Sequence, residues 1–478
     1  MLPMRSVEPR SFASWSRLLS TVAILSLSAT AAFGQSATSA VSTVVAFSAS
    51  TPNGGIVRGP DGAYYGTTAS ASTVTGGLVF RVTPDGSSVS TLYQMQNNES
   101  YGPAAGLLLG SDGLLYGTTT FGAVSVVANT SGTVFRLKPD GTGFTVIRNF
   151  ATWSTQNDSL SPINTEGAYP DATLIEGTDG FLYGVTRAGG PNGTGAVFKL
   201  AKDGTSFKVL HTFGAITSEK NATPVTNLDG IAPLGSLVQY SDGFLYGTTS
   251  SGGVNGQGTV FRVGMDGTGF QLVHIFPALS SSGSDPTNVS GASPAAGLTD
   301  GKDGRLYGVA GEGGANGVGT LFVIDPAARL LTVLHNFANA NGNGPTGALI
   351  VGRDSKLYGT TTFGGTNSNG NETNQGTIFS INRDGTGFTK LHSFDNSQGS
   401  NPRGPLLQIS DTNFVGINLN GGSCGSGTLY LYSGNGATVE GNTRCGRKQN
   451  NNSGGGSTAP LVLLLLGGLG LARALRRR

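Results

Sequence analysis

Charged residues are scarce in this chain. They make up 12% of its 478 residues, about half of the usual ~25%. The formal net charge of +2 comes from the two ends, because residues 1–34 carry a net +2 and residues 454–478 a net +4, which leaves −4 for the segment between them. That segment has no run of Lys or Arg, so it lacks the basic surface by which proteins bind nucleic acid. The sequence therefore predicts no nucleic-acid partner.

Catalytic and cofactor signatures are also missing. The chain has no nucleophile elbow in a strand–helix context, no phosphate loop with its Lys-Ser/Thr and no Asp-x-Asp-x-Asp-Gly calcium loop. We therefore predict no catalytic residue, no cofactor and no metal ligand. A carboxylate pair for glycoside chemistry remains an alternative among the acids outside the repeat pattern, which are Asp158, Glu166, Glu219, Asp285, Glu312 and Glu372.

Cysteine occurs only twice, at Cys424 and Cys445. Disulfides persist in oxidising compartments, and the N-terminus described below is typical of an exported protein. The two cysteines are therefore predicted to pair and to hold the segment after the last repeat against that repeat. The alternative is two free thiols.

Glycine, in contrast, is abundant, with 78 residues against a usual ~7% of a chain. It occurs within a repeated unit that is clearest over residues 241–276, where Asp-Gly, Leu-Tyr-Gly, Gly-Thr-Val-Phe and Asp-Gly-Thr-Gly-Phe follow in order. Runs rich in Thr, Val, Phe and Tyr between Gly turns predict an all-β fold. The units begin at Asp61, Asp112, Asp179, Asp242, Asp303, Asp354 and Asp411.

The number of strands predicts a closed ring. Each unit offers four short strands, but the seventh lacks its fourth, and one extra copy precedes the first unit at residues 42–47. In a ring, that N-terminal strand completes the last sheet, whereas an open solenoid gains nothing from it. Radial four-stranded sheets are the architecture of β-propellers. We therefore predict a monomeric seven-bladed β-propeller over residues 42–433.

The repeat resembles the GloVer tandem repeat of bacterial exported "choice-of-anchor" proteins, across residues 42–432. The resemblance implies export and attachment to the cell envelope, and it implies no agreed activity. The seventh unit departs from the pattern, with Asp411-Thr412-Asn413 in place of Asp-Gly and Val415 in place of Tyr, so the resemblance does not fix the geometry of its blade.

The N-terminal end has the features of an export signal. Residues 1–34 combine a basic start, an apolar run and small residues, as secretory signal peptides do. Cleavage is predicted between Gly34 and Gln35.

The C-terminal end has the features of a membrane segment. Residues 434–458 are a polar tether, and residues 459–478 are an apolar stretch followed by Arg. Its fourteen uncharged residues rise about 21 Å as a helix, short for a hydrocarbon core of ~30 Å. This tail resembles the GlyGly-CTERM sorting signal, which implies cleavage near Gly454, Gly455 and Gly456 by an inner-membrane rhomboid-type protease. The alternative is a permanent anchor that holds the protein in the membrane.

The four histidines occupy one position of the repeat, on the strand predicted to be outermost. They are His211, His274, His335 and His392. Equivalent positions on the outer strands of a ring lie far apart, so the four side chains cannot share one metal ion. We predict a structural role for them.

Loop lengths predict where a ligand would bind. The two Asp-Gly turns of each unit are short and lie on one face, whereas variable segments such as 121–131, 151–170 and 277–294 lie on the other. Binding usually occurs on variable loops of a rigid scaffold. The sequence thus favours a non-enzymatic scaffold at the envelope or cell surface, or released into the medium, with a carbohydrate or protein ligand near the ring axis. The alternative is a propeller enzyme, either a polysaccharide lyase or hydrolase or a lactonase, with its site on the same face.

Overall fold

The computed structural model describes residues 40–48, 50–70, 76–96, 100–122, 131–154, 163–219, 222–280, 285–367 and 369–436. In these ranges the chain forms strands and no helix, so none of the described residues belongs to a helix that could cross a membrane. The predicted all-β class is confirmed. The predicted signal peptide and C-terminal tail, and all but the first residues of the polar tether, lie outside the described residues.

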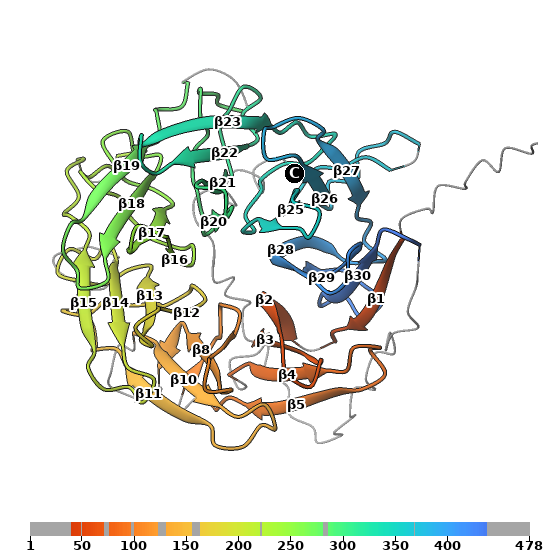
Figure 1. Cartoon of the computed structure of the whole chain (residues 1–478), viewed down its shortest axis with the longest axis horizontal. Coiled ribbons are helices and arrows are strands. Elements are labelled where there is room, and N and C mark those ends of the chain that lie inside the picture. Colours follow the sequence, from red (N-terminus) through yellow and green to blue (C-terminus); the bar gives the residue numbers. More distant parts are fainter. Residues whose placement is uncertain are drawn as a thin grey trace, which may run out of the picture. The chain divides into compact units, whose positions relative to one another are not determined.

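Seven four-stranded antiparallel sheets, here called blades, follow one another around a ring (Figure 1). Blade 1 contains β2 (Ser50–Arg58), β3 (Tyr64–Ser70), β4 (Leu78–Val82) and β5 (Val89–Gln94), and blade 2 contains β7 (Leu108–Leu109), β8 (Leu115–Thr119), β10 (Thr133–Leu137) and β11 (Thr145–Asn149). Blade 3 contains β12 (Ile175–Glu176), β13 (Leu182–Thr186), β14 (Ala196–Leu200) and β15 (Lys208–Thr212), and blade 4 contains β16 (Val238–Gln239), β17 (Phe244–Thr249), β18 (Thr259–Gly264) and β19 (Gln271–Ile275). Blade 5 contains β20 (Thr299–Asp300), β21 (Leu306–Ala310), β22 (Thr320–Asp325) and β23 (Leu330–Asn336), and blade 6 contains β24 (Ile350–Val351), β25 (Leu357–Thr361), β26 (Thr377–Ile381) and β27 (Thr389–Ser393).

Blade 7 closes the ring with strands from both ends of the chain. It contains β28 (Ser400–Gln408), β29 (Asn413–Asn420), β30 (Thr428–Ser433) and, as its outermost strand, β1 (Ala40–Ala46). Strand β1 pairs antiparallel with β30, and Ala40 lies opposite Ser433 (Figure 1). The Phe47 ring packs against Phe80 of blade 1, with 5.2 Å between the ring centroids. The prediction of a seven-bladed propeller closed by the N-terminal strand is confirmed.

The Asp-Gly turn between the first and second strands of a blade does more than reverse the chain. In blade 4, Asp242 accepts the N–H of Phe244 at 3.0 Å and the hydroxyl of the buried Tyr246 at 2.7 Å. Blades 1 to 6 all have this Tyr–Asp hydrogen bond, at 2.6 to 2.9 Å. Blade 7 has Val415 in place of the tyrosine. The spacing of Asp and Tyr in the repeat therefore follows from a bond that joins a turn to the core.

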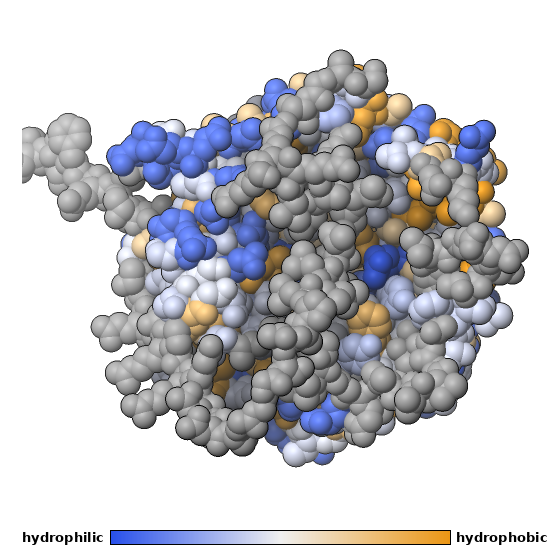
Figure 2. All heavy atoms as spheres, turned by 180° about the vertical axis from the view of Figure 1, so that it is seen from behind, coloured by the Kyte–Doolittle hydropathy of each residue, from blue (hydrophilic) through white to orange (hydrophobic). Residues whose placement is uncertain are grey.

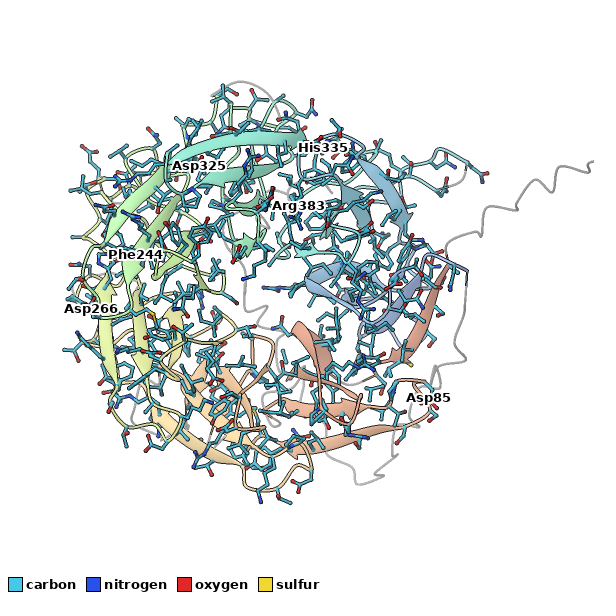
Figure 3. The ribbon with its side chains drawn as sticks, viewed as in Figure 1. Asp85, Phe244, Asp266, Asp325, His335 and Arg383 are labelled. Atoms are coloured by element: carbon cyan, nitrogen blue, oxygen red, sulfur yellow. The ribbon has the colours of Figure 1, made fainter. Side chains whose placement is uncertain are left out.

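The turns between the third and fourth strands lie at the periphery, as Asp85, Asp266 and Asp325 show in Figure 3. In the second strand of each blade, a glycine leaves room for a large side chain of the neighbouring third strand. A Cβ atom on Gly247 would lie 2.6 Å from the Phe261 ring of the same blade. The glycine of Leu-Tyr-Gly thus leaves room for the buried Phe of Gly-Thr-Val-Phe.

Small residues also line the ring axis. A segment within or just before each first strand reads Pro, any residue, Gly or Ala, a second residue and then Leu or Ile, beginning at Pro52, Pro103, Pro170, Pro233, Pro294, Pro345 and Pro402. Neighbouring segments touch through their backbones, since a Cβ atom on Gly404 would lie 2.6 Å from the carbonyl oxygen of Gly54. The missing side chains therefore allow seven first strands to converge.

Candidate ligand site at the mouth of the ring

The two faces of the ring differ in how their loops are built. The turn face carries the Asp-Gly turns. The opposite, loop face carries the loop after the second strand and the link from the preceding blade, and these two segments pair with each other. Ala168 pairs with Ala188 in blade 3, and in blade 2 the same pairing forms the two-stranded sheet of β6 (Ser100–Tyr101) and β9 (Phe121–Gly122). This arrangement agrees with the prediction that the variable segments share one face.

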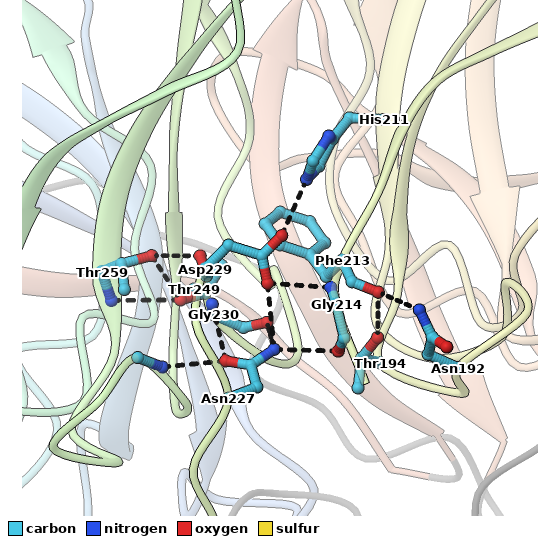
Figure 4. A network of polar contacts seen from close by, with 11 residues as sticks. Asn192, Thr194, His211, Phe213, Gly214, Asn227, Asp229, Gly230, Thr249 and Thr259 are labelled. Carbon is cyan, nitrogen blue, oxygen red and sulfur yellow. Dashed lines mark hydrogen bonds and ion pairs between the residues drawn. The ribbon is translucent and has the colours of Figure 1, made fainter. Parts of the chain in front are cut away.

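A loop motif that our sequence analysis missed organises the links. It reads Asn, any residue, a polar residue, Gly, two residues and Pro, and it begins at Asn164, Asn227, Asn288, Asn339 and Asn396. In Figure 4, Asn227 accepts the N–H groups of Gly230 and Gly253 and donates to the carbonyl oxygens of Gly214 and Gly230. One side chain therefore holds three loop segments together.

The third residue of this motif faces the histidine position. His211 Nε2 lies 3.1 Å from the Asp229 carboxylate, which also accepts the N–H of Gly214 at 2.8 Å (Figure 4). The His211 ring stacks on Phe270 of the next blade at 3.5 Å. In blade 2 the same position holds Arg148, which pairs with Glu166.

These side chains connect neighbouring blades. Tyr93 of blade 1 occupies the same position and stacks on Phe144 of blade 2 at 3.7 Å. Burial lowers the pKa values of His274, His335 and His392 below the usual value, in keeping with packing rather than charge. The structure thus supports the structural role of the histidines. Among the described residues, no three His, Cys, Asp or Glu side chains gather in a way that could hold a metal ion.

The mouth of the ring on the loop face departs from the repeat. We define it by two sets of equivalent positions. The residues that follow the prolines are Asn53, Ala104, Asp171, Leu234, Ala295, Thr346 and Arg403, and those that follow the second-strand signature are Ala69, Thr120, Arg187, Ser250, Gly311, Thr362 and Leu419. Only Asp171, Arg187 and Arg403 are charged among these fourteen. The charges therefore belong to blades 3 and 7 alone.

Asp171 and Arg187 form a fixed pair. Arg187 Nε donates to Asp171 at 2.7 Å, and the buried Thr120 hydroxyl of blade 2 donates to the other carboxylate oxygen at 2.7 Å. The Asp171 side chain is 13% exposed and that of Arg187 34% exposed. The guanidinium of Arg187 also lies over the Tyr169 ring, 5.0 Å from its centroid. Partners within the protein thus engage both carboxylate oxygens of Asp171.

Three half-buried aromatic rings lie beside this pair. Tyr101 and Phe121 stack at 4.8 Å, and Phe121 meets Tyr169 edge-on at 5.6 Å. Tyr169 has a left-handed backbone, with φ of 61°. A bulky residue is rarely found there, and such strain often marks functional sites.

The equivalent residues of five other blades share this left-handed conformation but are all smaller. They are Gly102, Ala232, Ser293, Gly344 and Asn401. Blade 3 therefore places a large ring at a position where the backbone favours a small residue.

Arg403 enters the mouth from blade 7. Its side chain is exposed, and among the described residues no carboxylate or other acceptor lies within hydrogen-bond distance of it. Although the residue is exposed to solvent, protein atoms crowd around its guanidinium, and this desolvation lowers its pKa, while the negative charge of Asp171 on blade 3 raises it. Arginine remains charged in proteins, so the mouth presents a positive charge that has no ion-pair partner among the described residues.

The other predicted sites fall elsewhere. Cys424 lies in the β29–β30 loop. The equivalent position of blades 3, 4 and 5 holds Asn192, Asn255 and Asn316, which donate to the carbonyl oxygen of the residue after the outer strand. Cys445 lies outside the described residues, so the disulfide stays a prediction. Gly34, Gln35 and Gly454–Gly456 also lie outside them, as does Asp158, while Glu166 is engaged by Arg148.

Comparison with sequence families gives one match over most of the chain. The profile of the Gloeobacter/Verrucomicrobia repeat matches residues 30–230 and 232–445. No curated protein matches the sequence.

Solved structures with a similar fold include three whose sequences are distant. The extracellular domain of a one-component system from B. thetaiotaomicron has a TM-score of 0.47 at 13% identity, covering 83% of this chain and 40% of that chain. An oligogalacturonate lyase from Vibrio parahaemolyticus has a TM-score of 0.46 at 12% identity, covering 83% and 97%. The GH74 xyloglucanase from Xanthomonas campestris has a TM-score of 0.48 at 14% identity, covering 80% and 52%. This chain spans well under half of the B. thetaiotaomicron chain.

Proposed function

We propose that this chain, which belongs to the Gloeobacter/Verrucomicrobia repeat family, is an exported, non-enzymatic propeller that binds a carbohydrate or protein ligand at its mouth. One observation carries the proposal. Within a ring of near-identical units, charged side chains and a strained aromatic ring gather at the loop-face mouth, around Asp171, Arg187, Arg403 and Tyr169. No repeated structural bond requires them there, so selection for a ligand is the simplest explanation.

Small residues at the axis support binding over catalysis. Glycoside chemistry needs two carboxylates at a defined separation, whereas the fourteen mouth positions contain one, Asp171, which Arg187 and Thr120 already engage. A propeller enzyme acting on a polysaccharide or lactone is the competing proposal. Product release from any polysaccharide would establish it.

A binding screen tests the proposal directly. We would present the purified propeller with a panel of soluble polysaccharides and follow binding by calorimetry, and reducing ends and unsaturated products by absorbance. The matched variants are Tyr169→Gly in the mouth and Gly344→Ala at the equivalent position of blade 6. We expect binding without turnover, lost in Tyr169→Gly and retained in Gly344→Ala. Binding that both variants retain would place the ligand elsewhere.

Export and attachment are separate parts of the proposal. They rest on the signal-like residues 1–34 and the GlyGly-CTERM-like tail with Gly454–Gly456. The proposed partners are an inner-membrane processing protease and the membrane itself. The intact mass of protein from membrane and medium tests this. A chain that ends near Gly454–Gly456 would support processing, and a membrane-bound chain that ends at Arg478 would make the tail a permanent anchor.

A further inference from the structure

We infer that the ligand at the mouth is an acidic saccharide, whose carboxylate pairs with Arg403 while a sugar ring stacks on Tyr169. The inference rests on the proposed function, because it names the ligand of the same site. Three features of the mouth support it: its charge balance, its aromatic rings and the small or hydroxylated residues that line it.

The charge balance calls for an anion. Asp171 is satisfied by Arg187 and Thr120, both at 2.7 Å. Arg403 has no such partner among the residues described, although the field of Asp171 acts on it. Arg binds carboxylates through paired donors, so a carboxylate in the mouth would give Arg403 the partner that it lacks among the described residues.

The aromatic rings call for a ligand with a flat apolar surface. A pyranose ring has a face of C–H groups and a rim of hydroxyls, and tyrosine offers a matching apolar ring with a polar tip. Tyr169 is held at a fixed angle by the edge of Phe121 at 5.6 Å and by Arg187 at 5.0 Å. Its orientation is therefore set before a ligand arrives, which reduces the entropy lost on binding.

The shape of the mouth favours a saccharide over an acidic peptide. Peptide side chains are usually anchored in apolar pockets, but the mouth positions are mostly small or hydroxylated, as in the Thr346–Thr362 pair with its oxygens 2.7 Å apart. Two depressions lie on the turn face, one of them beside Gln239, Asp300 and Lys302. The coloured part of the surface seen in Figure 2 mixes hydrophobic and hydrophilic residues.

The test compares one sugar in two charge states. We would measure by calorimetry the binding of oligogalacturonate tetramers and of the same tetramers after reduction of their carboxylates to alcohols. We expect the acidic tetramer to bind at least tenfold more tightly at low salt, and the difference to shrink as salt screens the charge. Arg403→Gln should abolish that difference and leave the weaker binding of the reduced tetramer. The control is Lys302→Gln on the turn face, which removes one charge from a side chain that is 80% exposed.

The outcomes separate the two proposals. Equal binding of both tetramers, or a preference that survives Arg403→Gln, overturns the acidic-saccharide inference and leaves the binding proposal intact. Binding only of an acidic peptide, such as a Glu-rich decamer, also overturns it. If no polysaccharide or peptide of the screen binds in a manner sensitive to Tyr169→Gly, both proposals fail.

Discussion

Removing the hydroxyl of Tyr246 tests whether the turn-to-core bond stabilises the blades. In Tyr246→Phe, Asp242 loses a hydrogen bond of 2.7 Å but keeps the N–H of Phe244 at 3.0 Å and Arg262 at 3.4 Å. A hydrogen bond to a charged group contributes about 1.5–3 kcal/mol. Since the carboxylate is not left unpaired, we expect a loss of about 1.5 kcal/mol in the free energy of unfolding.

Blade 7 offers a matched control. Tyr430 is 1% exposed and occupies the position where other blades have Phe, and its hydroxyl has no hydrogen-bond partner among the described residues. Tyr430→Phe should therefore change stability little or raise it. Urea unfolding followed by far-UV circular dichroism measures both variants, with the midpoints compared at equal slope. Equal midpoints for Tyr246→Phe and Tyr430→Phe would refute the contribution that we assign to the Tyr–Asp bond.

Three further predictions concern pH and ring closure. Burial and the hydrogen bond to Asp242 raise the pKa of Tyr246 to about 12, so the folded state keeps a proton that the unfolded chain loses near pH 10. The free energy of unfolding should therefore fall as the pH rises from about 10 through 12. Tyrosinate absorbance during urea titrations would show this. Burial lowers the pKa of His335, so stability should fall as the pH drops through about 6.5. Blade 1 has a tyrosine at this position, and His335→Tyr should weaken the pH dependence of melting curves between pH 5 and 8. Phe47→Ala and Phe276→Ala should each lower the free energy of unfolding by about 3–5 kcal/mol. Only Phe47→Ala should speed proteolytic cleavage near the N-terminal strand, because that strand closes the ring. Equal cleavage rates for the two variants would contradict this.

The repeat made the architecture predictable. Asp-Gly and Leu-Tyr-Gly recur because blades 1 to 6 all use the same turn, the same Tyr–Asp bond and the same space for a Phe, so single residues reveal the pattern. The surplus strand at residues 42–47 and the missing one after Tyr432 predict closure from the sequence alone. These features are local in the sequence or occur in many repeats, and either property allows them to be predicted from the sequence.

The mouth was not predictable in the same way. Thr120, Asp171 and Arg403 come from three blades. Their separation in sequence does not predict that they meet at the mouth, because this depends on how the blades are arranged around the ring. The pairing of His211 with Asp229 was missed because links of unequal length hide the Asn motif that places the carboxylate. Both omissions concern contacts between neighbouring units, which the pattern within one unit does not show.

The position of the seam determines which way the mouth faces. Strand β1 begins and strand β30 ends on the turn face, where Ala40 pairs with Ser433 and Gly434 donates its N–H to Thr412 of the neighbouring turn at 3.0 Å. Both termini of the propeller thus leave from the side opposite the mouth. A protein held by its C-terminal tail would then point its ligand site away from the surface that holds it, with no interdomain hinge needed to turn it outward.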